Sequence, residues 1–195
     1  MDWNNYQRNF PAKYIPMSRA MGDKIYSICK ANTINTVVDI GGGKNSATFM
    51  HIIINANTKI YLLDPYIIDN PSWISEKVGW DIHNVYDLGV CKGAINYLSI
   101  DQIRMIPTMC KRFVINTYNK APSTTWKSSE FTTLNDKEGT ERVRKNGPII
   151  EHQLVFKDKM ITHTFWDYKI KDLKQWLGNC NTKRYNNNSI LLYKE

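Results

Sequence analysis

The chain has 195 residues, a length that fits one domain with a substantial hydrophobic core. Hydrophobic residues make up 42% of it and charged residues 23%, values typical of a soluble globular protein. No apolar run approaches the roughly 18 residues of a membrane span, and the first residues lack the apolar core of a secretory signal. The composition therefore argues against a membrane protein and predicts a cytoplasmic one.

The cysteines and histidines give no sign of a metal centre. The four cysteines are widely scattered, and no pair has the Cys-x-x-Cys spacing of a zinc or redox site. We therefore expect buried or free thiols in a reducing compartment, and no metal.

The net charge of +8 is unevenly distributed. Residues 1–110 carry 10 Lys/Arg and 9 Asp/Glu, whereas residues 111–195 carry 16 and 9. A basic half that also contains many aromatic residues favours a polyanionic partner, RNA or DNA. The alternative is a solvated surface in a Lys- and Asn-rich proteome. The Asn-rich composition indicates an AT-rich genome, such as that of a phage or virus.

The N-terminal region, residues 1–33, is predicted to be a strap followed by a helix. Residues 1–18 are aromatic and contain two prolines, which break any long helix. Met21, Ile25 and Ile28 then recur at helical spacing, which predicts a helix over residues 18–31.

The next stretch, residues 36–56, has the pattern of a strand, a turn and a helix. A β-branched apolar run ends at three consecutive glycines, Gly41, Gly42 and Gly43, and helical periodicity follows over residues 45–54. Glycines at such a turn permit a sharp reversal and let a ligand approach the bare backbone. The helix that follows would direct its free N–H groups at that ligand.

A second strand, residues 60–64, ends in Asp64, about 20 residues beyond the glycines. In nucleotide-binding α/β folds, a carboxylate at this offset accepts hydrogen bonds from a ribose. The third spaced glycine of the dinucleotide fingerprint is missing, which argues against NAD. Pro65 and Tyr66 come next and are candidate cofactor contacts, and Tyr66 or Ile67 is predicted to form a wall for an adenine ring.

The acid before the glycines, Asp39, suits a ligand that carries an ammonium group. Asp39 and Asp64 together would place two negative charges around a cationic, ribose-bearing ligand. S-adenosylmethionine (SAM) fits that description, and we expect it as the cofactor, with S-adenosylhomocysteine (SAH) as its product.

These motifs resemble those of class I SAM-dependent methyltransferases. Residues 39–43 resemble the first motif of that family and residues 63–64 the second, while residues 85–119 resemble the later motifs. The run Asp64-Pro-Tyr66 is most similar to poorly characterised phage, viral and bacterial members. The resemblance implies a three-layer Rossmann-like α/β fold with a mostly parallel sheet and an antiparallel C-terminal edge strand. A Rossmann-like domain that binds another adenosine ligand is the alternative.

The strands that follow supply further candidates for the site. In the resemblance, residues 86–91 form the fourth strand, and its Asp87 and Cys91 are candidate cofactor contacts. A helix over residues 100–109 leads to a fifth strand, residues 112–118, whose Asn116 and Tyr118 are candidate catalytic groups that orient the substrate. Active groups of such sheets cluster at the carboxyl ends of the strands.

Motifs of particular nucleic-acid methyltransferases are absent or partial. The Asn/Asp-Pro-Pro-Tyr motif of amino-methylating members is missing, and so is a Pro-Cys nucleophile. The Lys-Asp-Lys-Glu tetrad of ribose methyltransferases is only partly represented. Arg19 and Lys24 resemble its first basic residue, Asp87 and Lys120 lie near suitable places, and no clear final Glu precedes the last strand.

Residues 121–168 are predicted to be an inserted loop and hairpin on the substrate side. Residues 121–148 show neither helical nor strand periodicity in their apolar residues and are predicted to form a long loop. Residues 149–165 are predicted to form a β-hairpin. His163 is a candidate base. The residues expected to contact a nucleic acid are Lys120, Arg142, Arg144, Lys145 and Trp166.

The sequence therefore predicts a single methyltransferase domain over residues 1–195, with a last helix over 169–177 and a final strand over 189–193. The leading function is a SAM-dependent methyltransferase acting on nucleic acid, most simply RNA or its cap. A methyltransferase of small molecules or proteins is the second reading. The third is a binding subunit with the same fold but no turnover, which activates a partner.

Overall fold

The computed structural model describes residues 15–43, 57–66, 74–80, 83–118, 123–133, 135–186 and 189–195. The chain divides into two compact units. One consists of Met17–Asn119 and Lys169–Glu195, and we call it the α/β unit. The other consists of Lys120–Tyr168 together with Met1–Pro16, and we call it the sheet unit.

The α/β unit is built on a seven-stranded sheet with the order β10-β11-β5-β4-β1-β2-β3. Strands β1 to β5 are mutually parallel, whereas β11 is antiparallel to both β5 and β10. This arrangement confirms the predicted, mostly parallel α/β fold with an antiparallel strand on its C-terminal side, although the edge itself is formed by β10, which was not predicted. The bounds are β1 Thr36–Ile40, β2 Lys59–Leu63, β3 Glu76–Lys77, β4 Tyr86–Cys91, β5 Cys110–Tyr118, β10 Asn181–Asn186 and β11 Ser189–Lys194.

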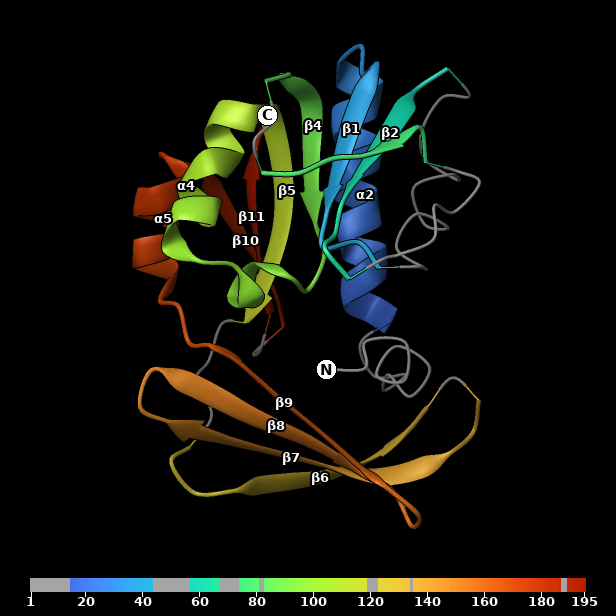
Figure 1. Ribbon diagram of the computed structural model, residues 1–195, viewed down its shortest axis with the longest axis vertical. Coiled ribbons are helices and arrows are strands. Elements are labelled where there is room, and N and C mark those ends of the chain that lie inside the picture. Colours follow the sequence, from blue (N-terminus) through green and yellow to red (C-terminus); the bar gives the residue numbers. More distant parts are fainter. Residues whose placement is uncertain are drawn as a thin grey trace. The chain divides into compact units, whose positions relative to one another are not determined.

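Helices lie on both faces of this sheet (Figure 1). Helix α2, Ile15–Ala31, packs Met21, Ile25 and Ile28 against apolar side chains of β1, β2, β4, β5 and β11. Helices α4, Ile100–Met109, and α5, Ile170–Leu177, lie together on the opposite face (Figure 1). A short 3₁₀ turn, η2, covers Ile95–Tyr97. None of the helices in the described ranges is long and apolar enough to cross a membrane.

Local sequence signals explain most of the helix ends. Ser99 caps α4 with a full capping box, because its side chain accepts a bond from the Gln102 N–H and the Gln102 side chain bonds back. Gly178 ends α5 in the left-handed conformation that glycine favours, with φ of 68°. Helix α2 starts three residues before the predicted Ser18, since Pro16 is tolerated in a first helical turn.

The sheet unit contains four antiparallel strands in the order β6-β7-β8-β9. They are β6 Lys127–Thr132, β7 Glu138–Asn146, β8 Ile149–Val155 and β9 Met160–Trp166. The predicted hairpin over 149–165 is confirmed by β8 and β9. The prediction of a loop over 121–148 is wrong, because β6 and β7 occupy most of it. A small core of Phe131, Leu154, Phe156 and Ile161 lies on one face of this sheet.

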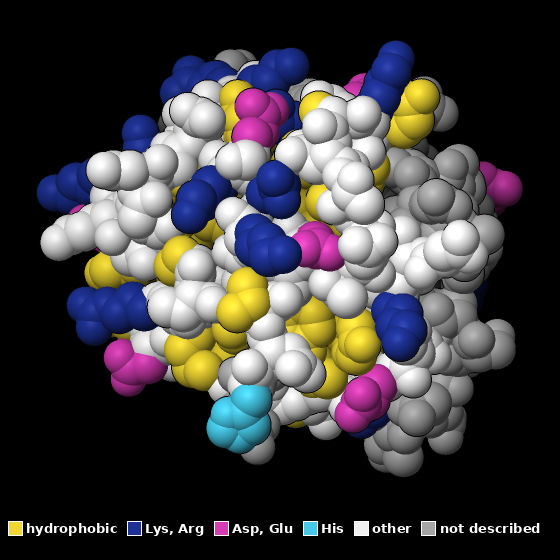
Figure 2. All heavy atoms as spheres, turned by 90° about the horizontal axis from the view of Figure 1, so that it is seen from above, with side chains coloured by type: hydrophobic (Ala, Val, Ile, Leu, Met, Phe, Trp, Pro, Cys, Tyr) yellow, Lys and Arg dark blue, Asp and Glu magenta, His cyan; other side chains and the backbone are white. Residues whose placement is uncertain are grey.

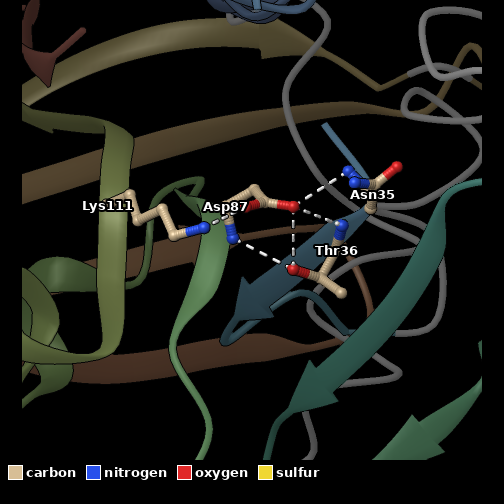
Figure 3. Close-up of polar contacts among 4 residues, drawn as sticks. All are labelled: Asn35, Thr36, Asp87 and Lys111. Carbon is tan, nitrogen blue, oxygen red and sulfur yellow. Dashed lines mark hydrogen bonds and ion pairs between the residues drawn. The ribbon is translucent and has the colours of Figure 1, made fainter. Parts of the chain in front are cut away.

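Asp87 joins the amino ends of three strands of the α/β unit (Figure 3). Its Oδ2 accepts hydrogen bonds from the backbone N–H groups of Asn35 at 2.9 Å and Thr36 at 3.2 Å. Its backbone N–H donates to the Thr36 hydroxyl at 3.0 Å, and Lys111 Nζ lies 2.8 Å from Oδ1. Burial alone would raise the pKa of Asp87, but the bonds from Lys111, Asn35 and Thr36 hold it below its usual value.

This clamp corrects the sequence-based assignment of Asp87 to the cofactor site. Asp87 is the second residue of β4, and the glycine turn follows the other end of the neighbouring strand β1. The carboxylate is thus directed at the start of β1, where it satisfies two backbone donors.

Asp87→Ala is expected to lower the free energy of unfolding by about 1–3 kcal/mol, because two backbone N–H groups lose their acceptor. Lys111→Met removes only a side chain that is 58% exposed, so we expect less than about 1 kcal/mol from it. Urea unfolding of both variants checks this. Equal losses would mean that the ion pair, and not the backbone bonds, accounts for the stabilisation.

Candidate cofactor site

The glycine turn after β1 requires glycine at each of its three positions. Gly41 and Gly43 adopt φ values of 67° and 63°, which side chains disfavour. A Cβ on Gly41 would lie 2.4 Å from Ala94 Cβ, and one on Gly42 would lie 2.1 Å from Asp39 Oδ2. The turn is therefore bare backbone, packed against the loop after β4 and against the carboxylate of Asp39.

Asp64 fixes the end of this turn. Its Oδ2 accepts a hydrogen bond from the Gly43 N–H, and its Oδ1 accepts one from the Tyr66 N–H, both at 2.9 Å. The Gly41 N–H donates to the Leu63 carbonyl at 2.8 Å, which ties the turn to the end of β2. A carboxylate has about four acceptor positions, so Asp64 retains capacity for a ribose diol.

Asp39 is fully buried on β1, where its backbone pairs with Val90 of β4. The carboxyl ends of β1, β2, β4 and β5 meet at one edge of the parallel sheet. The structure thus brings Asp39, the three glycines and Asp64 together, as the sequence predicts.

Asn116 lies at the same edge, near the end of β5. It is buried, and its Oδ1 accepts a hydrogen bond from the Gly93 N–H at 2.5 Å. The next residue, Thr117, donates to Asn96 Oδ1 at 3.1 Å. These bonds hold the loop after β4, so Asn116 positions this loop, and its contact with a substrate stays a prediction.

The remaining candidates at this edge differ in exposure. Cys91 is fully buried, and burial raises the pKa of its thiol, so it packs as a neutral group. Tyr66 is 64% exposed, and Pro65 beside it is also exposed, so a role for them as an adenine wall remains a prediction. The side chain of Tyr118, the residue Lys120 and the predicted helix over 45–54 lie outside the described part of the chain.

One glycine of β4 has a packing role. Gly89 lies inside β4, where a Cβ would come within 2.5 Å of Cys110 Sγ. It therefore makes room for a neighbouring strand and does not line an opening for a substrate.

The other candidates belong to the sheet unit. Arg144 is paired with Glu151, with Nη2 2.6 Å from the carboxylate, and its guanidinium lies 4.6 Å from the ring centre of Trp126. Lys145 is paired with Asp167. Arg142 is exposed.

Trp166 is also exposed, and its ring stacks on Tyr168 with centres 6.3 Å apart. Two of the predicted cations are thus engaged in ion pairs within the unit.

His163 is buried in a chain of titratable groups on three adjacent strands. Glu141 Oε1 lies 2.8 Å from His152 Nε2, and His152 Nδ1 lies 2.9 Å from His163 Nε2. Burial lowers the pKa of His163 to about 3, the neighbouring His152 adds to this effect, and Glu141 opposes it. A buried imidazole with so low a pKa is a weak base, which does not favour the predicted role of His163 as a catalytic base.

Sequence reasoning missed Glu141, His152 and Lys92. Glu141 and His152 occupy buried positions of β7 and β8. Alternation of apolar and polar residues would have revealed these strands, but here the buried positions hold polar residues. Lys92 follows β4 directly, next to the glycine turn, and its charge interacts with Asp39. No motif identified it.

Comparisons with known proteins give structural matches only, since no family model and no curated protein sequence matches the chain. The SAM-bound amino pentose methyltransferase CalS10 from Micromonospora echinaspora, involved in calicheamicin biosynthesis, matches with a TM-score of 0.61 at 9% identity, over 92% of this chain and 90% of that one. A protein of Pyrococcus horikoshii OT3 matches with a TM-score of 0.58 at 10% identity, over 91% and 89%.

The glycopeptide N-methyltransferase MtfA, complexed with SAH, matches with a TM-score of 0.51 at 10% identity, over 95% of this chain and 90% of that one. At such identities the likeness establishes the fold, which is the Rossmann-like fold of SAM-dependent methyltransferases.

The unfolding free energy is expected to fall as the pH drops from 6.5 towards 3, because the unfolded chain binds a proton at His163 that the folded chain rejects. The contribution of His163 is complete above pH 6.5 and is lost by about 1.4 kcal/mol per pH unit within that window. Urea unfolding of the wild type and His163→Gln between pH 7.5 and 4.5 measures it.

The exposed His83 offers a matched control, His83→Gln. The variant of the buried histidine should show a shallower pH slope than the wild type, and the control should not. Identical slopes in all three proteins would contradict the prediction.

Proposed function

We propose that the protein is a SAM-dependent methyltransferase. The observation that carries the proposal is the arrangement of Asp39, the bare glycine turn and Asp64 at the carboxyl edge of a parallel sheet. The fold, which is that of SAM-dependent methyltransferases, supports it.

The residues fit the proposed cofactor group by group. Asp64 would bind the ribose hydroxyls, the backbone of residues 41–43 would accommodate the methionine end, and Asp39 would offset the ammonium charge. A side chain on Gly42 would displace the Asp39 carboxylate, so the cradle depends on this glycine.

Bound SAM supplies an activated methyl group, and the chemistry asks little more of the protein than alignment of the acceptor and exclusion of water. The buried Asn116 contributes by fixing the loop after β4, at the edge where the acceptor would approach. No described side chain needs to form a covalent intermediate.

Titration calorimetry should show micromolar binding of SAM and SAH. Asp64→Asn, which keeps one acceptor oxygen for the turn but loses the charge, is expected to weaken binding at least about tenfold, or 1.4 kcal/mol. Asp101→Asn removes a carboxylate that is 92% exposed and should bind as the wild type does. Unchanged affinity in folded Asp64→Asn would refute the assignment.

For the acceptor, we propose a small molecule, such as a sugar or a peptide-borne group, ahead of a nucleic acid. Residues 1–16 and 120–168 together carry ten Lys/Arg and eight Asp/Glu, so the sheet unit is close to neutral. Two of the cations predicted to contact phosphates, Arg144 and Lys145, are engaged in ion pairs. Structural neighbours described as an amino pentose methyltransferase and a glycopeptide N-methyltransferase agree with this reading.

RNA remains the second candidate, because residues 169–195 carry six Lys/Arg and only two Asp/Glu. On the face that Figure 2 draws, however, Lys and Arg side chains lie at many points with acidic and hydrophobic side chains between them. A nucleic-acid site usually gathers its basic residues into one patch or stripe.

Retention on heparin and on RNA separates the two acceptor classes. We expect weak retention, which salt at a roughly physiological concentration of about 150 mM abolishes. Methyl transfer from labelled SAM into total RNA should stay at background, whereas a pool of small glycosides should become labelled. Salt-resistant retention together with labelled RNA would reverse the order of the candidates. Binding of SAM without any methyl transfer would favour the third candidate function, a binding subunit that activates a partner.

A further inference from the structure

Strand β9 forms one edge of the sheet unit. The order β6-β7-β8-β9 places β9 beside β8 and, among the described residues, beside no other strand (Figure 1). The edge of a sheet presents backbone N–H and C=O groups with which a further strand can pair. Proteins usually protect such an edge by keeping the strand short, or by charged side chains, proline or a bulge.

The other edges of the two described sheets are protected in this way. Strand β3 has only two residues, and both are charged. Strand β6 contains Lys127 and Glu130, and β10 contains Lys183 and Arg184. Strand β9, in contrast, reads Met-Ile-Thr-His-Thr-Phe-Trp, without Lys, Arg, Asp, Glu or Pro, and it pairs with β8 without a shift in register. It is therefore a long, regular edge that its own sequence does not protect.

The hydrogen bonds beside β9 show which of its backbone groups face this edge. The Asp167 N–H donates to the Pro148 carbonyl at 2.9 Å, and the Phe156 N–H donates to the Lys159 carbonyl at 2.8 Å, at the two ends of the β8–β9 ladder. Bonded and non-bonded pairs alternate along an antiparallel ladder, so every second residue between Lys159 and Asp167 bonds to β8. The residues between them direct their backbone groups away from β8: Met160, Thr162, Thr164 and Trp166.

These outward residues are complementary to themselves about His163. When a second β9 runs antiparallel to the first with the axis at His163, Met160 lies opposite Trp166 of the other copy, and Thr162 lies opposite Thr164. Each of these pairs joins two residues whose backbone groups face outward, so each exchanges two backbone hydrogen bonds.

The side chains match in the same register. Among the described residues of the sheet unit, Met160 and Trp166 are the exposed large hydrophobic side chains, at 58% and 43%, and the pairing places each beside the other. A thioether beside an aromatic ring and a pair of threonines are both favourable across strands.

The buried face of β9 continues across the same axis. Ile161 lies opposite Phe165 of the other copy, so the apolar side chains of one sheet meet those of the next. The two His163 side chains lie opposite each other. Because burial lowers the pKa of His163 to about 3, both imidazoles are neutral at pH 7 and do not repel each other.

We propose that the protein forms a homodimer in which the two β9 strands pair antiparallel about a twofold axis at His163. The sheets of the two sheet units then form one continuous sheet. Such a contact is closed, because it uses the same edge of both copies, and the assembly stops at two chains. The proposal does not depend on the cofactor and adds an assembly to the proposed methyltransferase.

Sedimentation velocity of the full chain at micromolar concentration should give a particle of twice the 22.7 kDa of one chain. The variant with both Thr162→Lys and Thr164→Lys places like charges directly opposite each other across the axis. The variant with Thr162→Glu and Thr164→Lys differs only at residue 162 and places opposite charges there. We expect the first variant to dimerise at least about tenfold more weakly than the second.

Both variants are expected to fold, which thermal unfolding checks. Within one chain Thr162 lies opposite Gln153 and Thr164 lies opposite Glu151, so neither variant sets like charges opposite each other inside the sheet. A monomeric wild type would overturn the proposal. Equal dissociation constants of the two folded variants would overturn it as well.

Cysteine cross-linking tests the register. With both Thr162→Cys and Thr164→Cys, opposed cysteines have Cα atoms about 5.5 Å apart, within the range of a disulfide, so mild oxidation should give a covalent dimer. Thr162→Cys alone places its two thiols on the diagonal, at about 7–8 Å, and should cross-link little more than the wild type, which reports the background of the native cysteines. Equal cross-linking of the single and double variants would overturn the pairing about His163.

Discussion

The α/β unit depends on one steric fit, that of the Asp39 carboxylate under the bare backbone of Gly42. The carboxylate occupies the space that any side chain at Gly42 would fill, so the acid and the glycine require each other. Asp64 then secures the far end of the same turn through the Gly43 N–H. Asp39 on β1 and Asp64 directly after β2 thus fix a loop of backbone at the carboxyl edge of the sheet, and parallel pairing brings β4 and β5 to that edge as well.

The same sheet shows why a carboxylate on a strand is not enough to identify a site. Asp39 and Asp87 both lie within strands of the sheet, and both are buried. Asp39 is the fourth of five residues in β1 and therefore lies near the carboxyl edge, whereas Asp87 is the second residue of β4. Asp87 satisfies the backbone where β1 begins, and this stabilises the register of the strands that carry the site.

Much of this arrangement could be predicted from the sequence because it follows from strong local signals. The β-branched run before the glycines, the acid after the second strand, the capping box at Ser99 and the glycine after α5 each predict a boundary that the structure has. The strands β6 and β7 could not be recognised, because Glu141 occupies a buried position where an apolar residue would have revealed the alternation. Strand β10 is polar and lies at the edge of the sheet, so its sequence resembles a loop.

The distribution of charge carries the functional argument beyond the cofactor. A basic C-terminal half indicated a polyanionic partner, but a count over the sequence ignores where the charges are neutralised. In the sheet unit, Glu151 and Asp167 neutralise two of the predicted cations, and Arg144 is further fixed against Trp126. A guanidinium paired in this way contributes little to the long-range electrostatic attraction of a phosphate. The near-neutral charge of this unit therefore supports the proposal of a small-molecule acceptor.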